Sequence, residues 1–176
     1  MKKIVLIAVV LLSFRGVYAQ TAELPAEEAD LYSTRAEKFS DSTGALIQKE
    51  YIRVGNILDC VIDVVHYTDL VNGTKVSALR FSDALGKVAI LDEDEIGALV
   101  ISMKIIRDTV LVSAPSHYTE TFFRSRCGFE AGSYYDKGVW KSYLKLRRHD
   151  NNSYTFMKKG DFDIFLKILG NARAKI

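Results

Sequence analysis

The sequence has few of the residues that build stalks and cross-linked scaffolds. Among its 176 residues are 2 prolines and 2 cysteines, which excludes a proline-rich linker and a small disulfide-dense domain. Hydrophobic residues make up 48% of the chain and charged residues 26%, which are the proportions of a globular protein. We therefore expect one domain with a hydrophobic core of its own.

The sequence also lacks the motifs of common catalytic and nucleotide-binding sites. It contains neither the G-x-S-x-G turn of many hydrolases nor a glycine-rich phosphate loop. Its histidines, His66, His117 and His149, are too far apart in sequence for the paired spacing of a zinc site. We predict no metal and no cofactor. An alternative is a hydrolase in which His66 or His117 acts with a nearby acid, such as Asp63 or Glu120.

Only one long hydrophobic run is present, from Ile4 to Leu12. It follows two lysines and precedes Val17-Tyr18-Ala19, and it is shorter than the roughly 20 residues that span a bilayer. This pattern predicts a cleaved bacterial export signal over residues 1–19; the alternative is a buried N-terminal strand. The mature chain would have no transmembrane segment and would be periplasmic or extracellular.

Cleavage changes the charge balance. It removes Lys2, Lys3 and Arg15, which are three of the 24 basic residues, and none of the 22 acidic ones. The mature chain then has a net charge of −1, so its charge gives no reason to expect nucleic acid as a partner.

Alternating apolar and polar residues begin after a polar segment, residues 20–43. We expect this segment to be flexible or to hold a short helix around residues 26–38, and residues 44–176 to form a single domain. The predicted strands cover residues 45–54, 58–69, 75–81, 87–91, 118–127, 129–135, 139–148 and 153–157. The Asn72-Gly73 dipeptide predicts a tight hairpin turn.

Two helices interrupt this pattern. Asp92 and Glu95 have capping-box spacing, and the apolar residues that follow recur at helical spacing, which predicts a helix over residues 93–107. Capping also explains the four consecutive acids, residues 92–95, without a bound cation. Asp161 is the expected N-cap of a C-terminal helix with an apolar stripe.

The order of four strands, a helix, four strands and a helix predicts an α+β fold. We expect a largely antiparallel sheet of about eight strands, flat or strongly curved, with one helix mid-chain and one at the C-terminus. A barrel-like sheet closed by the last helix is the alternative. A distant internal duplication would suit this order, although no residue-level repeat supports it.

The two cysteines, Cys60 and Cys127, both fall in predicted strands. An exported protein can form a disulfide between them. The equally weighted alternative is two buried free thiols that pack as small hydrophobic residues.

Basic residues and a tyrosine gather in the C-terminal half. Arg124 and Arg126 are predicted on one strand face, and a second face holds Lys141, Tyr143, Lys145 and Arg147. If these strands are neighbours, they form a positive, aromatic surface suited to an anionic glycan or lipid headgroup. The alternative is the solvated outer face of a sheet.

These features favour a non-catalytic binding or interaction module of the bacterial cell envelope. Besides the hydrolase, the remaining alternative is an assembly component whose apolar surface is completed by an envelope protein.

Overall fold

The computed structural model describes residues 33–158 and 160–176. The predicted export signal, residues 1–19, lies outside this part of the chain, as do residues 20–32. The remainder of the polar segment carries a short helix, α2 (Arg35–Ser40). None of the helices within the described residues has the length and apolar character needed to cross a membrane.

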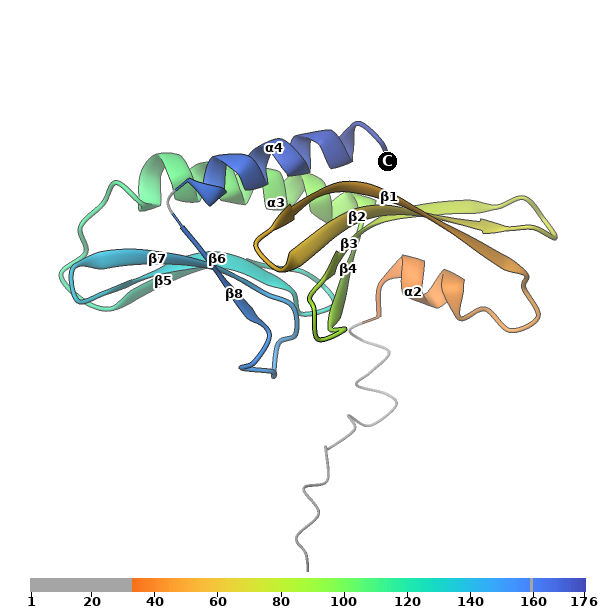
Figure 1. Ribbon diagram of the computed structural model, residues 1–176, viewed down its shortest axis with the longest axis horizontal. Helices are drawn as coiled ribbons and strands as arrows, with labels where there is room; N and C mark the ends of the chain where they lie inside the picture. The colour runs from red at the N-terminus through yellow and green to blue at the C-terminus, as the bar shows by residue number, and fades with distance from the viewer. Residues whose placement is uncertain (1–32, 159) are drawn as a thin grey trace, which may run out of the picture.

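The strands form two four-stranded antiparallel sheets, each with its strands in sequence order (Figure 1). The first sheet contains β1 (Ile47–Ile57), β2 (Cys60–Asp69), β3 (Lys75–Ser82) and β4 (Val88–Asp92). It leads into α3 (Glu93–Ile105), which continues as a π-helical segment, η1 (Ile106–Val110). The second sheet contains β5 (Thr119–Arg124), β6 (Glu130–Asp136), β7 (Val139–Lys145) and β8 (Tyr154–Met157), and leads into α4 (Asp161–Arg173).

This architecture confirms the predicted α+β class, with antiparallel strands and helices in the middle and at the end of the chain. The eight strands are divided between two sheets, and neither sheet closes into a barrel. Within the described residues no ladder joins the two sheets, and α3, η1 and a loop connect β4 to β5. Each half is therefore a four-stranded antiparallel meander followed by a helix. The two halves share this order of elements but no residue-level sequence repeat.

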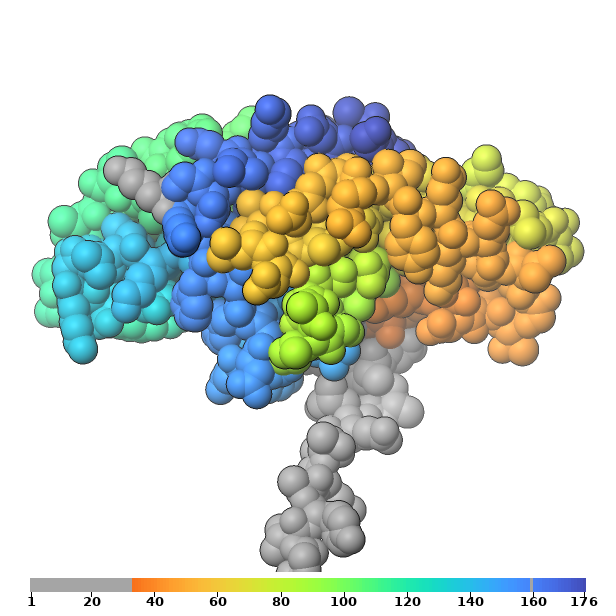
Figure 2. Space-filling model, in the orientation of Figure 1, coloured from red at the N-terminus to blue at the C-terminus, as the bar shows by residue number. Residues whose placement is uncertain are grey.

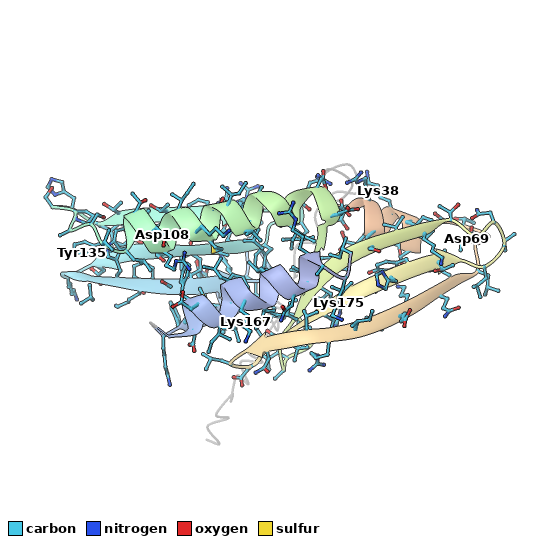
Figure 3. All side chains as sticks on the ribbon, turned by 90° about the horizontal axis from the view of Figure 1, so that it is seen from above. Lys38, Asp69, Asp108, Tyr135, Lys167 and Lys175 are labelled. Atoms are coloured by element: carbon cyan, nitrogen blue, oxygen red, sulfur yellow. The ribbon has the colours of Figure 1, made fainter. Side chains whose placement is uncertain are left out.

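The two long helices lie side by side over the sheets (Figures 1 and 3) and close one shared core. At its centre the ring of Phe81 in β3 stacks on Phe129 at 4.4 Å, and Phe165 in α4 meets Phe81 edge-on at 6.3 Å. The helix α4 also crosses β1, where a Cβ on Gly55 would lie 2.6 Å from Cδ1 of Ile168. Gly55 thus allows the close approach of α4 at a point where the β1–β2 register shifts.

The tight turn lies at a different hairpin from the one predicted. Asn72-Gly73 belongs to a longer loop, residues 70–74, in which only Gly73 has a positive φ, of 76°. The Asp69 carboxylate closes this loop by accepting the Val71 amide at 2.8 Å. A two-residue connection with positive φ at both positions joins β6 to β7 instead, at Lys137 (51°) and Gly138 (84°), as a type I′ turn requires.

The start of α3 is a junction between elements. The predicted cap is present, since Oε2 of Glu95 accepts the Asp92 amide at 3.0 Å. The Asp92 carboxylate is itself buried, and it accepts the backbone amides of Arg35 at 2.8 Å and Ala36 at 3.1 Å, which begin α2. One carboxylate therefore serves the first turn of a second helix as well.

Arginines from two other segments complete this acidic cluster. Arg126 contacts Asp92 at 2.6 Å and Asp94 at 2.8 Å, and Arg35 contacts Asp94 at 2.8 Å. Although desolvation opposes ionisation, the hydrogen bonds from Arg126 and Arg35 hold the pKa of Asp94 below its ordinary value. Asp92, Asp94 and Glu95 converge closely enough for a cation, but arginines already pair with Asp92 and Asp94, and Glu95 accepts the backbone amides of Asp92 and Arg126.

Two sequence predictions are corrected here. Cys60 and Cys127 are free thiols; Cys60 begins β2 in the first sheet, and Cys127 lies in the turn after β5 in the second. Both pack on the shared core, as the alternative of two buried thiols predicts. In addition, α4 begins after Gly160, and the Asp161 carboxylate accepts the amide of Lys158 at 2.8 Å instead of capping the helix.

Candidate functional site

The face of the second sheet that points away from α3 and α4 contains a hollow of about 570 Å³. We call it the aromatic hollow. It is lined by residues of all four strands, of the β7–β8 loop and of the position before β5: Tyr118, Glu120, Phe122, Arg124, Glu130, Tyr134, Tyr143, Lys145, Arg148, His149, Tyr154 and Phe156. The alternate residues of these strands, such as Phe123, Ala131 and Leu144, pack into the core.

Strand register arranges the lining in rows across the sheet. One row is charged and runs through Arg124, Glu130, Lys145 and Tyr154, each opposite the next. The neighbouring row runs through Phe122, Gly132, Tyr143 and Phe156. In the middle of this second row Gly132 has no side chain, and this allows the close approach of Phe122 in β5, whose Cβ would lie 2.5 Å from a Cβ at Gly132.

Aromatic rings follow one another from one side of the hollow to the other. Ring centroids lie 6.2 Å apart between Tyr118 and Tyr134 and 6.3 Å apart between Tyr134 and Tyr143. Tyr143 meets Tyr154 edge-on at 5.2 Å, and Tyr154 stacks on Phe156 at 5.7 Å with only 7° between the ring planes. The chain of rings thus provides both flat faces and hydroxyl groups.

Charged groups are fixed among these rings. Arg124 holds the buried Glu130 carboxylate through Nε and Nη2, each 2.8 Å from Oε1, and its guanidinium lies 4.8 Å above the Phe122 ring. The ammonium of Lys145 lies 4.8 Å from the centre of the Tyr154 ring. The hollow therefore offers cations, a carboxylate and aromatic faces within one concavity.

Two tyrosines of the hollow have raised pKa values, for different reasons. The Tyr118 hydroxyl donates to the Glu120 carboxylate, and this bond raises the pKa of Tyr118 to about 12. Burial raises the pKa of Tyr143. The single phenolic proton of Tyr118 is already donated to Glu120, so of these two tyrosines Tyr143 is the one whose hydroxyl can donate to an acceptor on a ligand.

The β7–β8 loop forms one wall of the hollow and is tied to the first sheet. Nζ of Lys87, in the β3–β4 loop, lies 2.8 Å from a carboxylate oxygen of Asp150. These two loops meet at the lower edge of the molecule in Figure 2. The position of Arg148 and His149 therefore depends on both sheets.

The predicted basic surface is only partly assembled. Arg124, Tyr143 and Lys145 line the hollow together. Lys141 lies on the same sheet face beside them, 5.5 Å from the Tyr134 ring and 3.8 Å from Asp136.

Two of the predicted residues lie elsewhere. Arg126 does not share the face of Arg124, because β5 ends at Arg124 and the following turn directs Arg126 to the acidic start of α3. Arg147 is exposed in the β7–β8 loop, beyond the end of β7.

Sequence reasoning missed several residues of the hollow, including Glu130, Phe122, Phe156 and Arg148. Phe122 could have been predicted, because the alternation of residues 118, 120, 122 and 124 places it on the same strand face as Arg124. Glu130, which lies opposite Arg124, depends on strand register, which one sequence does not provide.

The histidines suggested for a hydrolase lie apart from acids. His66 contacts the Ser77 hydroxyl through Nδ1 at 2.7 Å, and it alternates with Asp63 along β2, so the two side chains point to opposite faces. Glu120 binds Tyr118 and not His117. Within residues 33–158 and 160–176, no hydrogen bond joins a histidine to a carboxylate.

Comparison with known proteins does not add to this description. Scans of protein families, curated proteins and solved structures find no match to the chain.

Proposed function

We propose that this protein is an exported, non-catalytic binding module of the bacterial cell envelope, and that it takes a sugar-bearing ligand in the aromatic hollow. The observation that carries the proposal is the chain of aromatic rings across a concave sheet face, with fixed charged groups between the rings. Export rests on the sequence of residues 1–19 alone.

The composition of the hollow suits a sugar. A pyranose ring has apolar C–H faces that stack on aromatic rings and hydroxyl groups around its edge that need hydrogen-bond partners. Phe122 and Phe156 are 39% and 52% exposed, so their rings are open to contact. The half-exposed Arg124 guanidinium, held by the buried Glu130 carboxylate, provides hydrogen-bond donors beside these rings. The volume of about 570 Å³ falls within the range of small-molecule sites.

The hydrolase alternative has less support from this geometry. Cleavage by acid–base chemistry needs a positioned proton donor and acceptor. The charged pair in the hollow, Arg124 and Glu130, neutralises itself, and the histidine that reaches the wall, His149, has no carboxylate partner among the described residues.

The test is a titration of ¹⁵N-labelled protein, residues 20–176, with a panel of neutral and acidic oligosaccharides. We expect amide shifts to concentrate in β6, β7 and β8. Phe156→Ala should weaken binding at least about tenfold, since a hot-spot aromatic contributes about 2 kcal/mol or more. Tyr51→Ala is the matched control, because Tyr51 is 55% exposed on the first sheet. Absence of binding across the panel, or shifts confined to the first sheet, would refute the proposal.

A further inference from the structure

The most unusual group in the hollow is the side chain of Lys145. The residue is only 7% exposed, and among the described residues it forms no ion pair within 4.0 Å and no hydrogen bond through its ammonium. Among the described residues no fully buried side-chain nitrogen lacks a hydrogen-bond partner, so the Lys145 stem is buried while its ammonium reaches the solvent in the hollow. Its one polar contact is with the face of the Tyr154 ring.

The nearest acid is already occupied. Glu130 lies directly opposite Lys145 in the β6–β7 ladder, which is the position where a cross-strand ion pair would form. Its carboxylate oxygen Oε1 instead accepts two nitrogens of Arg124 from the other side. In the charged row, Arg124 and Glu130 thus form an ion pair with each other, and the Lys145 ammonium stands outside that pair.

The geometry points to Lys145 as the receptor for the anionic group of an acidic sugar, with the sugar ring resting on the neighbouring aromatic rings. This inference rests on the proposed function and names the ligand class. The ammonium lies beside Tyr154, whose ring stacks on Phe156, so an anion bound to Lys145 would place an attached ring against this pair. The ammonium is open to the hollow and has no competing ion pair, so it can form a charge-assisted hydrogen bond, which is stronger than a neutral one.

An anionic membrane surface fits this site less well than a single acidic sugar. Binding to a bilayer needs a broad positive surface, whereas Lys145 lies in a concavity that also holds Glu120 and Glu130. These carboxylates would face the other headgroups of the bilayer. One anion that enters the hollow meets the ammonium without requiring the surrounding surface to be positive.

The test compares acidic sugars with their neutral esters. Trigalacturonic acid, a hyaluronan tetrasaccharide and sialyllactose are each titrated as the free acid and as the methyl ester, which removes only the charge. We expect at least one acid to bind about tenfold or more tighter than its ester, as expected for a charge-assisted hydrogen bond. In Lys145→Met this ratio should fall to about one, with the affinity for the ester unchanged.

Lys49→Met is the matched control, because Lys49 lies 5.5 Å from the Tyr67 ring on the first sheet; it should keep the acid-to-ester ratio of the unmodified protein. Equal affinity for acid and ester in the unmodified protein would overturn the role of Lys145 and leave the binding module standing, provided that Phe156→Ala weakens both. An unchanged ratio in Lys145→Met would do the same. If no acid and no ester binds, the sugar-binding function itself is refuted.

Discussion

At the scale of single residues, the effect of Lys145 on stability shows whether its side chain serves ligand binding or the structure of the sheet. A lysine that is only 7% exposed and has no acid partner within 4.0 Å reduces stability, and natural proteins accept such a cost where the group serves function. Its contact with the Tyr154 ring at 4.8 Å recovers only part of this cost.

We therefore expect Lys145→Met, which keeps the length of the side chain and removes the charge, to raise the free energy of unfolding by about 1 kcal/mol. Urea denaturation at pH 7 measures this. Lys49→Met, on the first sheet, should change stability by no more than about 0.5 kcal/mol. A loss of stability in Lys145→Met would mean that the ammonium holds the sheet together.

The Cys60 thiol makes the free energy of unfolding depend on pH in the alkaline range. Burial raises the pKa of its thiol from 9.0 to about 12, so the unfolded chain loses this proton at a lower pH than the folded one. The contribution is complete below pH 9 and is lost as the pH rises toward 12. We expect the urea midpoint to fall above pH 9, and to fall less steeply in Cys60→Ala. Equal slopes in the two proteins would contradict the assignment to Cys60.

At the scale of elements, the shape of the hollow depends on a glycine in β6. A Cβ on Gly132 would lie 2.5 Å from both the Thr121 carbonyl oxygen and Cβ of Phe122. Since these are atoms of β5 close to or in its backbone, the strand itself must move to admit a methyl group.

We expect Gly132→Ala to lower the free energy of unfolding by about 1–3 kcal/mol, as overpacking does, and to displace Phe122 from the hollow. Gly97→Ala is the control: a Cβ on Gly97, in α3, would meet no atom within 4 Å, and alanine there should stabilise the helix by up to about 1 kcal/mol. Thermal denaturation of both variants checks the contrast. Equal effects would show that β5 and β6 are not tightly apposed at this point.

The elements themselves could be predicted because their signals are local. Alternation located the strands, and the spacing of Ile96, Leu99 and Met103 located α3, in which all three are buried. The division into two sheets could not be predicted, since it depends on which strands pair. Strand pairing also limited the prediction of the site. Alternation within one strand identified Tyr143 and Lys145, whereas the pairing of Arg124 with Glu130 depends on the register between two strands. Arg126 was misplaced because the end of β5 lies two residues before it.

At the scale of the whole molecule, side chains from one half hold the other in place. The Lys87–Asp150 ion pair joins a loop of the first sheet to the wall of the hollow. Arg126, from the second half, reaches Asp92 at the end of β4. The helix α4 belongs to the second half in sequence, yet it packs on β1. We therefore expect the two halves to unfold in one cooperative transition, although each has its own sheet.

A substitution of Asp92 is the most direct test of this cooperative unfolding. Its carboxylate, with 2% of the side chain exposed, joins the first turn of α2, the start of α3 and Arg126 from the turn after β5. Removing it leaves two amides of α2 without their acceptor and an arginine without its buried partner. We expect Asp92→Ala to lower the free energy of unfolding by about 2–4 kcal/mol, chiefly through the two amides left without an acceptor, with a single transition followed by circular dichroism and by Trp140 fluorescence.

Asp94→Ala provides the matched comparison, because Asp94 meets the same Arg126 and Arg35 but its side chain is 52% exposed. Solvent screens such pairs, so its loss should cost less than about 1 kcal/mol. Similar effects of the two variants would show that the arginines, and not the buried carboxylate, hold the junction. Two separate transitions in Asp92→Ala, one at each probe, would show instead that this carboxylate couples halves that otherwise fold independently. A single transition at lower stability is expected, since the core around Phe81, Phe129 and Phe165 continues to join both sheets.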